Sequence, residues 1–194
     1  MKLSIELKVK SSKEWLDMVM HDFNSFLQDH ADCERKASAM ALSFVAKYPE
    51  KKEIIPDLIE TAVEELDHFQ QVYQVMEKKG IPLASEIEKD IYINKLMSLC
   101  RSGREERFMD RLLMASIVEC RGCERFKMVA DELTDLDLKE FYKELWTSEA
   151  RHGEIFAKMA LKYFDEKIVF ERLEYFSNQE AEILNSLEVR SAVH

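Results

Sequence analysis

Two Glu-x-x-His pairs constrain this chain more than any other feature of its sequence. Glu65 and His68 form the first pair, and Glu149 and His152 form the second, in the other half of the chain. Side chains three residues apart leave the same face of an α-helix, so each pair presents a carboxylate and an imidazole together. The repetition predicts two similar helical segments that carry the same set of metal-binding groups.

A single glutamate precedes each pair at nearly the same distance, on a stripe of small and apolar residues. The interval from Glu34 to Glu65 almost equals the interval from Glu119 to Glu149. Glu124 is a second candidate, but its shorter interval to Glu149 breaks this match and its helical stripe carries other charged residues. We therefore expect Glu119 to be the ligand and keep Glu124 as the alternative.

The composition favours long helices. Only 4 glycines and 3 prolines occur among 194 residues, and a chain of this length can bury one core, so we expect a single domain over residues 1–194. We predict a helix opened by a capping box of Ser11 and Glu14, a break within 22–25, and then helices to about 48, from 56 to 80, 85–100, 104–133, 135–164 and 167–188.

The order of these helices predicts the fold class. Short turns make the two long helices of each half an antiparallel hairpin, and the connector 81–102 is long enough to cross the length of a bundle. We predict an all-α, ferritin-like four-helix bundle with additional N-terminal, connector and C-terminal helices. Residues 1–10 are expected to form a weakly held arm, and residues 190–194 a frayed tail.

Charge balance favours metal over salt bridges among the six side chains. Four buried carboxylates carry −4, which two divalent cations balance, whereas interhelical salt bridges would need Lys or Arg on the same stripes, where we find none. Oxygen and nitrogen ligands with open positions suit iron or manganese better than structural zinc. The expected roles are bridging for Glu65 and Glu149, terminal for Glu34 and Glu119, and one imidazole on each metal for His68 and His152.

Several side chains near these ligands could support them. Asp67, Ser148 and Glu144 are candidates to orient the imidazoles. His30, one turn before Glu34, either supports that ligand or is an ordinary core or rim histidine. Cys120 and Cys123 form a Cys-x-x-Cys without a second pair, so we interpret them as packing residues.

The charge distribution limits the possible partners. The chain has 28 basic and 38 acidic residues, and a net charge of −10 argues against generic nucleic-acid binding. One basic stripe at the start of the third long helix is either a phosphate-contacting rim or a solvated face. It consists of Arg101, Arg104, Arg107 and Arg111. Four cysteines without a secretory leader suggest a cytoplasmic protein, and no apolar run is long enough for a membrane span.

Four stretches of this sequence resemble the tRNA 2-methylthio-N-isopentenyl-adenosine hydroxylase family of the ferritin-like di-iron superfamily, over about residues 12–187. They are residues 29–37 (DHADCERKA), 64–69 (EELDHF), 119–126 (ECRGCERF) and 148–152 (SEARH). The resemblance implies a non-haem di-iron monooxygenase that hydroxylates the isopentenyl side chain of the modified adenosine beside the anticodon. It also implies two iron ions, O2 as co-substrate, tRNA as substrate, and an external electron donor of the ferredoxin or reductase type.

Other functions remain open at this point. The first is a ferritin-like di-iron oxidase, peroxidase or hydroxylase that acts on a small molecule. The second is an iron-binding or iron-storage protein, and the third is an interaction module with a structural metal. We expect a monomer, because no stripe of residues demands a partner.

Overall fold

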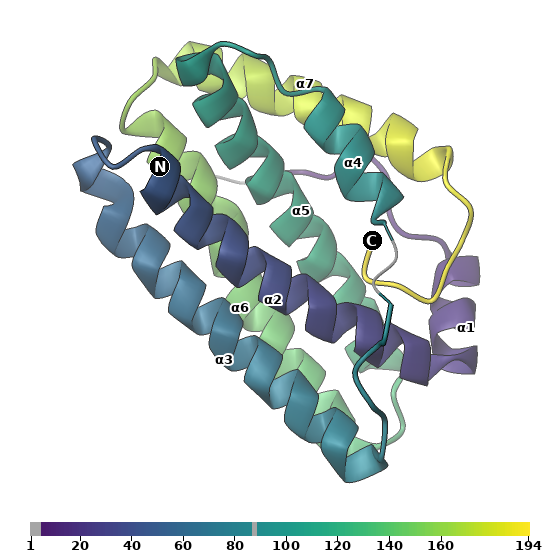
Figure 1. The fold of residues 1–194 in the computed structure, drawn as a ribbon. Coiled ribbons are helices and arrows are strands. Elements are labelled where there is room, and N and C mark those ends of the chain that lie inside the picture. The colour runs from purple at the N-terminus through teal and green to yellow at the C-terminus, as the bar shows by residue number, and fades with distance from the viewer. Residues whose placement is uncertain (1–4, 87–88) are drawn as a thin grey trace. The chain divides into compact units, whose positions relative to one another are not determined.

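The computed structural model describes residues 5–86 and 89–194, which form seven α-helices, one short 3₁₀-helix and no strand (Figure 1). The elements are α1 (Lys13–His21), α2 (Phe23–Lys47), η1 (Lys52–Ile54), α3 (Ile55–Lys79), α4 (Ile91–Ser98), α5 (Arg104–Glu132), α6 (Leu136–Leu161) and α7 (Glu166–Asn185). Among the described helices, none is both long and apolar enough to cross a membrane.

The chain divides into two compact units. The α2–α3 unit comprises residues 17–88 and 190–193, and the α5–α6 unit comprises residues 1–16, 89–189 and 194. Each unit contains one of the two predicted hairpins. The expectation of a single domain over residues 1–194 stays a prediction.

Local chemistry sets the ends of the helices in the α2–α3 unit. The Asp22 side chain accepts a hydrogen bond from Ser25 N at 3.2 Å and caps α2, so the expected break falls there. Pro56 lies in the first turn of α3, and Gly80 ends α3 with a φ of 68°, which glycine adopts without steric cost. The two helices lie antiparallel in Figure 1, and Ser38 Oγ of α2 donates to the Ala62 carbonyl of α3 at 2.7 Å.

In the α5–α6 unit, α5 and α6 form the second hairpin, and α4 and α5 both contact α7. Asp135 caps α6 by accepting hydrogen bonds from Asp137 N and Leu138 N. Asp165 caps α7 in the same way. The predicted connector helix was too long: α4 begins at Ile91, where Asp90 caps it, and residues 87 and 88 of the prediction lie outside the described part of the chain.

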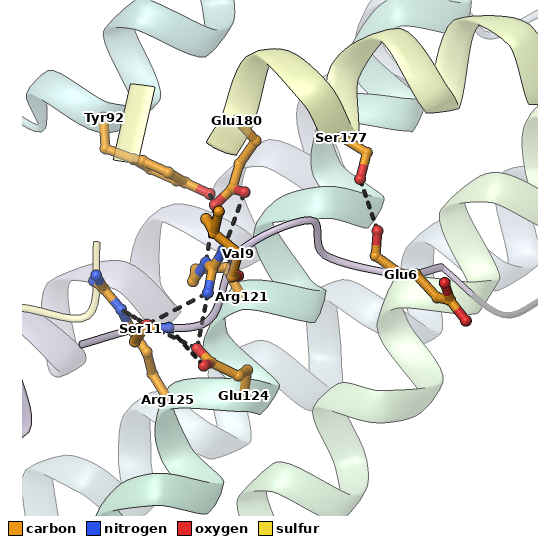
Figure 2. A network of polar contacts seen from close by, with 9 residues as sticks. All are labelled: Glu6, Val9, Ser11, Tyr92, Arg121, Glu124, Arg125, Ser177 and Glu180. Atoms are coloured by element: carbon orange, nitrogen blue, oxygen red, sulfur yellow. Dashed lines mark hydrogen bonds and ion pairs between the residues drawn. The ribbon is translucent and has the colours of Figure 1, made fainter. Parts of the chain in front are cut away.

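The N-terminal arm is held in place, contrary to our expectation. Of its residues, 1–4 lie outside the described part, but the Val9 carbonyl accepts from Arg121 Nη2 at 2.9 Å (Figure 2). The predicted capping box was also wrong, because Ser12 caps α1 and the Ser11 hydroxyl donates to Glu124 Oε2 at 2.7 Å. Arg121 is fully buried and pairs with Glu180 through Nε at 2.8 Å.

The C-terminal tail is held as well, so the prediction of a frayed end was wrong. Within the α2–α3 unit, Ser191 Oγ donates to the Asp22 carbonyl at 2.7 Å and Val193 N donates to Asp29 Oδ2 at 2.6 Å. Within the α5–α6 unit, the His194 ring stacks on Tyr92 with centroids 5.1 Å apart. Burial lowers the pKa of His194 to about 4, so this ring is neutral at pH 7.

Candidate metal centre

The first group of ligand atoms lies in the α2–α3 unit. Glu34 of α2 and Glu65 and His68 of α3 are all buried, and each offers one ligand atom within 4.8 Å of the others. His68 Nδ1 lies 3.3 Å from Glu65 Oε2 and 3.7 Å from Glu34 Oε2. We call these three residues the first triad. Both carboxylates face the same imidazole nitrogen, which is the arrangement expected of ligands that share one ion.

His30 contacts the first triad from one turn earlier in α2. It is fully buried, and its Nε2 hydrogen-bonds Glu34 Oε1 at 2.7 Å. A histidine that bonds a metal-ligating carboxylate fixes the orientation of that carboxylate. The contact fits a histidine that orients Glu34, and it equally fits a core histidine whose hydrogen bond is satisfied, so both roles stay predictions. The only sequence signal for it is the i, i+4 spacing, which is common in helices of every kind.

The second triad lies in the α5–α6 unit and repeats the first. Glu119 of α5 and Glu149 and His152 of α6 each offer one ligand atom within 4.8 Å of the others. Glu149 and His152 are buried, Glu119 is 9% exposed, and His152 Nδ1 lies 3.3 Å from Glu149 Oε2. The distance from imidazole to paired glutamate is thus the same in both triads.

Glu124, the alternative to Glu119, has a different role. Its carboxylate accepts from Ser11 N at 2.8 Å, from Ser11 Oγ at 2.7 Å and from Arg121 Nη1 at 2.9 Å (Figure 2). These contacts fix the N-terminal arm on α5. Glu119 therefore lies in the second triad, and Glu124 binds Ser11 at the end of the N-terminal arm.

The donor set of each triad suits a divalent cation. Two carboxylates so close together in a buried site repel each other unless a proton or a cation lies between them. Among the described residues, the Oε1 atoms of Glu65 and Glu149 are buried and receive no hydrogen bond. Two carboxylates with one imidazole match the donors that iron and manganese prefer. Each triad therefore fits one such ion.

The sequence was compared with known protein families and known structures. Residues 2–194 match the family described as tRNA-(MS[2]IO[6]A)-hydroxylase (MiaE). The chain belongs to this family. A relative from Pseudomonas putida, named tRNA 2-(methylsulfanyl)-N(6)-isopentenyladenosine(37) hydroxylase, is 34% identical over 172 residues, which are 89% of this chain and 83% of the relative.

A relative of the same name from Salmonella typhimurium is 33% identical over 138 residues, which are 71% of this chain and half of that protein. Family membership and these relatives confirm the predicted tRNA hydroxylase function. Among solved structures, a Synechococcus protein with aldehyde deformylating oxygenase activity matches with a TM-score of 0.90 and 30% identity, over 95% of this chain and 92% of that chain. This match confirms the predicted all-α, ferritin-like fold class.

Gly153 brings the two helices of the second triad close together in this MiaE-family protein. A Cβ at Gly153, directly after His152, would lie 2.7 Å from Cys120 Sγ and 3.5 Å from the Ser116 carbonyl. Real Cβ atoms essentially never approach another atom as closely as the first of these distances. A side chain at position 153 would therefore press on the Cys120 thiol next to Glu119 and His152, whereas the backbone of α5 would stay at ordinary van der Waals distance. Sequence reasoning missed this role, because one glycine inside a helix does not reveal its neighbours.

The cysteine pair packs against this same helix contact. Burial raises the pKa of Cys120 to about 12 and that of Cys123 to about 11, so both thiols stay protonated at pH 7. Cys123 Sγ donates to the Trp146 carbonyl on α6 at 3.3 Å. Protonated thiols are poor metal ligands, and the geometry agrees with the packing role predicted for both cysteines.

Of the three residues expected to orient the imidazoles, Asp67 and Glu144 are exposed and Ser148 is half-exposed. Asp67 is exposed and accepts from Gln71 Nε2 at 2.6 Å, and Ser148 accepts from Arg151 Nη2 at 3.5 Å. These residues are close to the ligands in sequence, but their side chains lie on the outer side of the helix.

The four arginines do not form one exposed stripe. Arg101 precedes α5 and donates to Asp110 through its backbone N, Nε and Nη2 at 2.9, 3.0 and 2.8 Å. Arg111 is buried, whereas Arg104 is exposed and Arg107 is half-exposed. Contact with tRNA stays a prediction. Because they are exposed or half-exposed, Arg104 and Arg107 are the two arginines that it now involves.

Proposed function

We propose that the two triads together hold a carboxylate-bridged pair of iron ions, and that the protein uses O2 at this site to hydroxylate the isopentenyl side chain of 2-methylthio-N-isopentenyladenosine in tRNA. The carrying observation is the repetition of the same triad in both units, with two carboxylates and one imidazole each. The combined set, with a Glu-x-x-His pair on each of two helices, is the ligand set of ferritin-like di-iron proteins.

Charge supports two ions. The four glutamates contribute −4 when ionised, and two ferrous ions contribute +4, so the filled site is neutral apart from what O2 and substrate bring. In this proposal Glu65 and Glu149 would bridge the ions, Glu34 and Glu119 would be terminal ligands, and His68 and His152 would bind one ion each. His30 holds Glu34 in position through the 2.7 Å hydrogen bond.

When bound, the iron pair supplies the reduction of O2 and the oxidising power for the C–H bond. In the overall reaction, C–H, O2, two electrons and two protons give C–OH and water. The chain contributes fixed ligands and a dry environment. Tyr142 and Phe156 of α6 are fully buried, and the Phe126 ring of α5 packs on Tyr142 with centroids 5.7 Å apart. Tyr142 precedes Glu149 by two helical turns and Phe156 follows His152 by one, so buried apolar residues flank these ligands along α6 and limit the access of water.

The remaining partners follow from this reaction. An external donor of the ferredoxin or reductase type delivers the two electrons, and the protein acts as a monomer in the cytoplasm, where tRNA is found. Support for the cytoplasmic setting includes four cysteines, all of them free thiols. A second candidate is oxidation of a small apolar substrate, favoured by the match to the Synechococcus protein with aldehyde deformylating oxygenase activity.

The decisive experiment is nucleoside analysis of modified tRNA after incubation with the iron-loaded protein, O2 and a chemical reductant. We expect a hydroxylated isopentenyl nucleoside to appear. Conversion of an aldehyde without any change in the tRNA would favour the small-molecule function instead. A large closed shell in a size measurement would favour iron storage.

The ligand assignment has its own test in a matched pair of variants. Glu119→Gln removes a proposed ligand, whereas Glu124→Gln, further along α5, removes a contact to the N-terminal arm. We expect Glu119→Gln to lower the iron content of the reconstituted protein, and Glu124→Gln to keep two ions per chain while lowering stability. Equal iron content in both variants would contradict the choice of Glu119.

A further inference from the structure

The outer side of α3 carries an unusual concentration of exposed apolar side chains. Eleven large apolar or aromatic side chains are exposed among residues 5–86 and 89–194, and four of them lie on this one helix. They are Ile59, Val63, Leu66 and Tyr73, which are 47%, 63%, 55% and 41% exposed. Their spacing of four, three and seven residues places them in one row along the helix. We call this row the α3 stripe.

The α3 stripe borders an open groove of about 520 Å³. Six residues line the groove, all from α3: Val63, Leu66, Asp67, Phe69, Gln70 and Tyr73. Within this lining, the Phe69 and Tyr73 rings stack with centroids 6.5 Å apart. Exposed apolar surface of this kind, rimmed by polar residues, marks an interaction site.

The middle of the α3 stripe, at Leu66, shares a helical turn with two proposed metal ligands, Glu65 and His68. Leu66 is directly bonded to Glu65, and Asp67 is directly bonded to His68, so the outer surface is one helix backbone away from the first triad. Glu65 and His68 are buried, while Leu66 and Asp67 are exposed. A protein bound at the stripe would therefore be close enough to exchange electrons with the site but not to bring a substrate bond into it.

An acidic ridge runs beside the stripe. Glu60, Glu64 and Asp67 each follow a stripe residue by one position, so the two rows are parallel. No Lys or Arg occurs in α3 before Lys78. This ridge repels RNA phosphates, and it would also repel itself in a symmetric pairing of two α3 helices. A partner with basic residues around an apolar centre is the complement that this surface fits.

The size of the surface supports a short-lived contact. Four partly exposed side chains on one helix offer on the order of a few hundred Å², below the roughly 800 Å² per partner of a stable complex. Electron-transfer encounters occupy that low end of the range. We propose that the α3 stripe and its acidic ridge are the docking surface for the electron donor, a redox protein with an apolar contact patch and a basic rim.

This inference rests on the proposed function, because it assumes an iron site that needs two electrons for each turnover. Each encounter passes one electron, which oxidises the donor by one and reduces the site by one. Of the two donor types in the proposed function, the acidic ridge therefore favours a reductase with a basic rim over an acidic ferredoxin. The selection acts through electrostatic steering, which salt weakens.

The test uses cytochrome c as the probe, because its exposed haem edge is ringed by lysines. Iron-loaded protein is reduced with dithionite, freed of excess reductant and mixed without O2 with ferricytochrome c, or with ferricyanide, which needs no docking surface. Val63→Ser combined with Leu66→Ser should slow the cytochrome reaction about tenfold, within the range seen for association rates of interface variants. Leu136→Ser, at a residue of α6 that is 78% exposed, is the control and should react as the wild type does.

Glu60→Lys should also slow the cytochrome reaction and weaken its dependence on salt. The ferricyanide rate and iron content of the Val63/Leu66 variant should equal those of the wild type. The proposal is wrong if that variant reduces cytochrome c at the wild-type rate, if Leu136→Ser is equally slow, or if the wild type reduces only ferricyanide. It is also wrong if the two substitutions instead weaken tRNA binding, or if they convert a dimeric protein into monomers. A wild-type protein that binds no iron and reduces neither oxidant would refute the proposed function, and the docking proposal with it.

Discussion

Replacement of Asp110 by asparagine should destabilise the protein more than any change on its surface. Asp110 is fully buried on α5 and accepts five hydrogen bonds, three from Arg101 and two from Arg172. Arg172 Nη2 also donates to the Leu99 carbonyl at 2.8 Å, so one carboxylate ties the connector and α7 to α5. Asparagine keeps one oxygen and turns an amide donor toward the guanidinium groups.

The magnitude follows from this geometry. Removing one partner of a buried, hydrogen-bonded charge pair costs about 3–5 kcal/mol in the free energy of unfolding. For a chain of this size each kcal/mol lowers the melting temperature by roughly 2–4 °C, so we expect a decrease of about 6–20 °C. Urea unfolding followed by helical circular dichroism measures the free energy directly. Asp131→Asn, at an exposed carboxylate of the same helix, is the control and should change stability by less than about 0.5 kcal/mol.

The pH dependence provides an independent check. Burial raises the pKa of Asp110, but the hydrogen bonds from Arg101 and Arg172 outweigh it and hold the pKa below its ordinary value. A lowered pKa in the folded state means that the stabilisation is complete above the unfolded pKa of about 3.9 and is lost as pH falls through the folded value. The difference between wild type and Asp110→Asn should thus be full at pH 7 and should close below about pH 4. Equal stability of the two proteins at pH 7 would refute this reasoning.

Three further predictions concern other parts of the structure. Gly153→Ala should cost about 1–3 kcal/mol, because its methyl group presses on the Cys120 thiol, and it should weaken iron binding. Cys120→Ala in the same chain should restore both properties, as measured by unfolding and iron titration. Glu180→Gln should cost about 3–5 kcal/mol in the free energy of unfolding, because it breaks the fully buried ion pair with Arg121. It should also speed hydrogen exchange in the N-terminal arm, which Arg121 binds, and unchanged exchange would contradict the role of that pair. Arg104→Ala combined with Arg107→Ala should weaken tRNA binding and reduce its salt dependence while iron content stays constant; an unchanged salt slope would remove both residues from the tRNA interface.

The limits of prediction from sequence are clearest for the two carboxylates of α5. Glu119 was chosen over Glu124 from its spacing and its apolar stripe, and the structure places Glu119 with Glu149 and His152. The partner of Glu124 was not predictable, because it is Ser11, which is far away in the sequence. Whether the six side chains bind two ions together stays a prediction.

The arginines show the same limit. All four arginines are spaced by three or four residues, which places them on one expected helical stripe. Sequence alone therefore cannot distinguish Arg101 and Arg111 from the exposed Arg104 and Arg107. A buried carboxylate at Asp110 binds Arg101, and the fold covers Arg111. Charge and periodicity describe one segment at a time, whereas burial depends on which other segments pack against it.

By itself, the sequence determined the order of the helices, the two pairs of glutamate and histidine, the fold class and the family. Each of these depends on residues close together in the chain, such as Asp22 with Ser25 or Glu65 with His68. Only the tertiary structure decided that the terminal segments are held, that Glu124 bonds Ser11, and that apolar side chains remain exposed on α3. The physical reason is that a buried polar group needs a hydrogen-bond partner, and that the partner can come from any segment that packs beside it in the folded chain. The sequence around one group does not show which distant segment that will be.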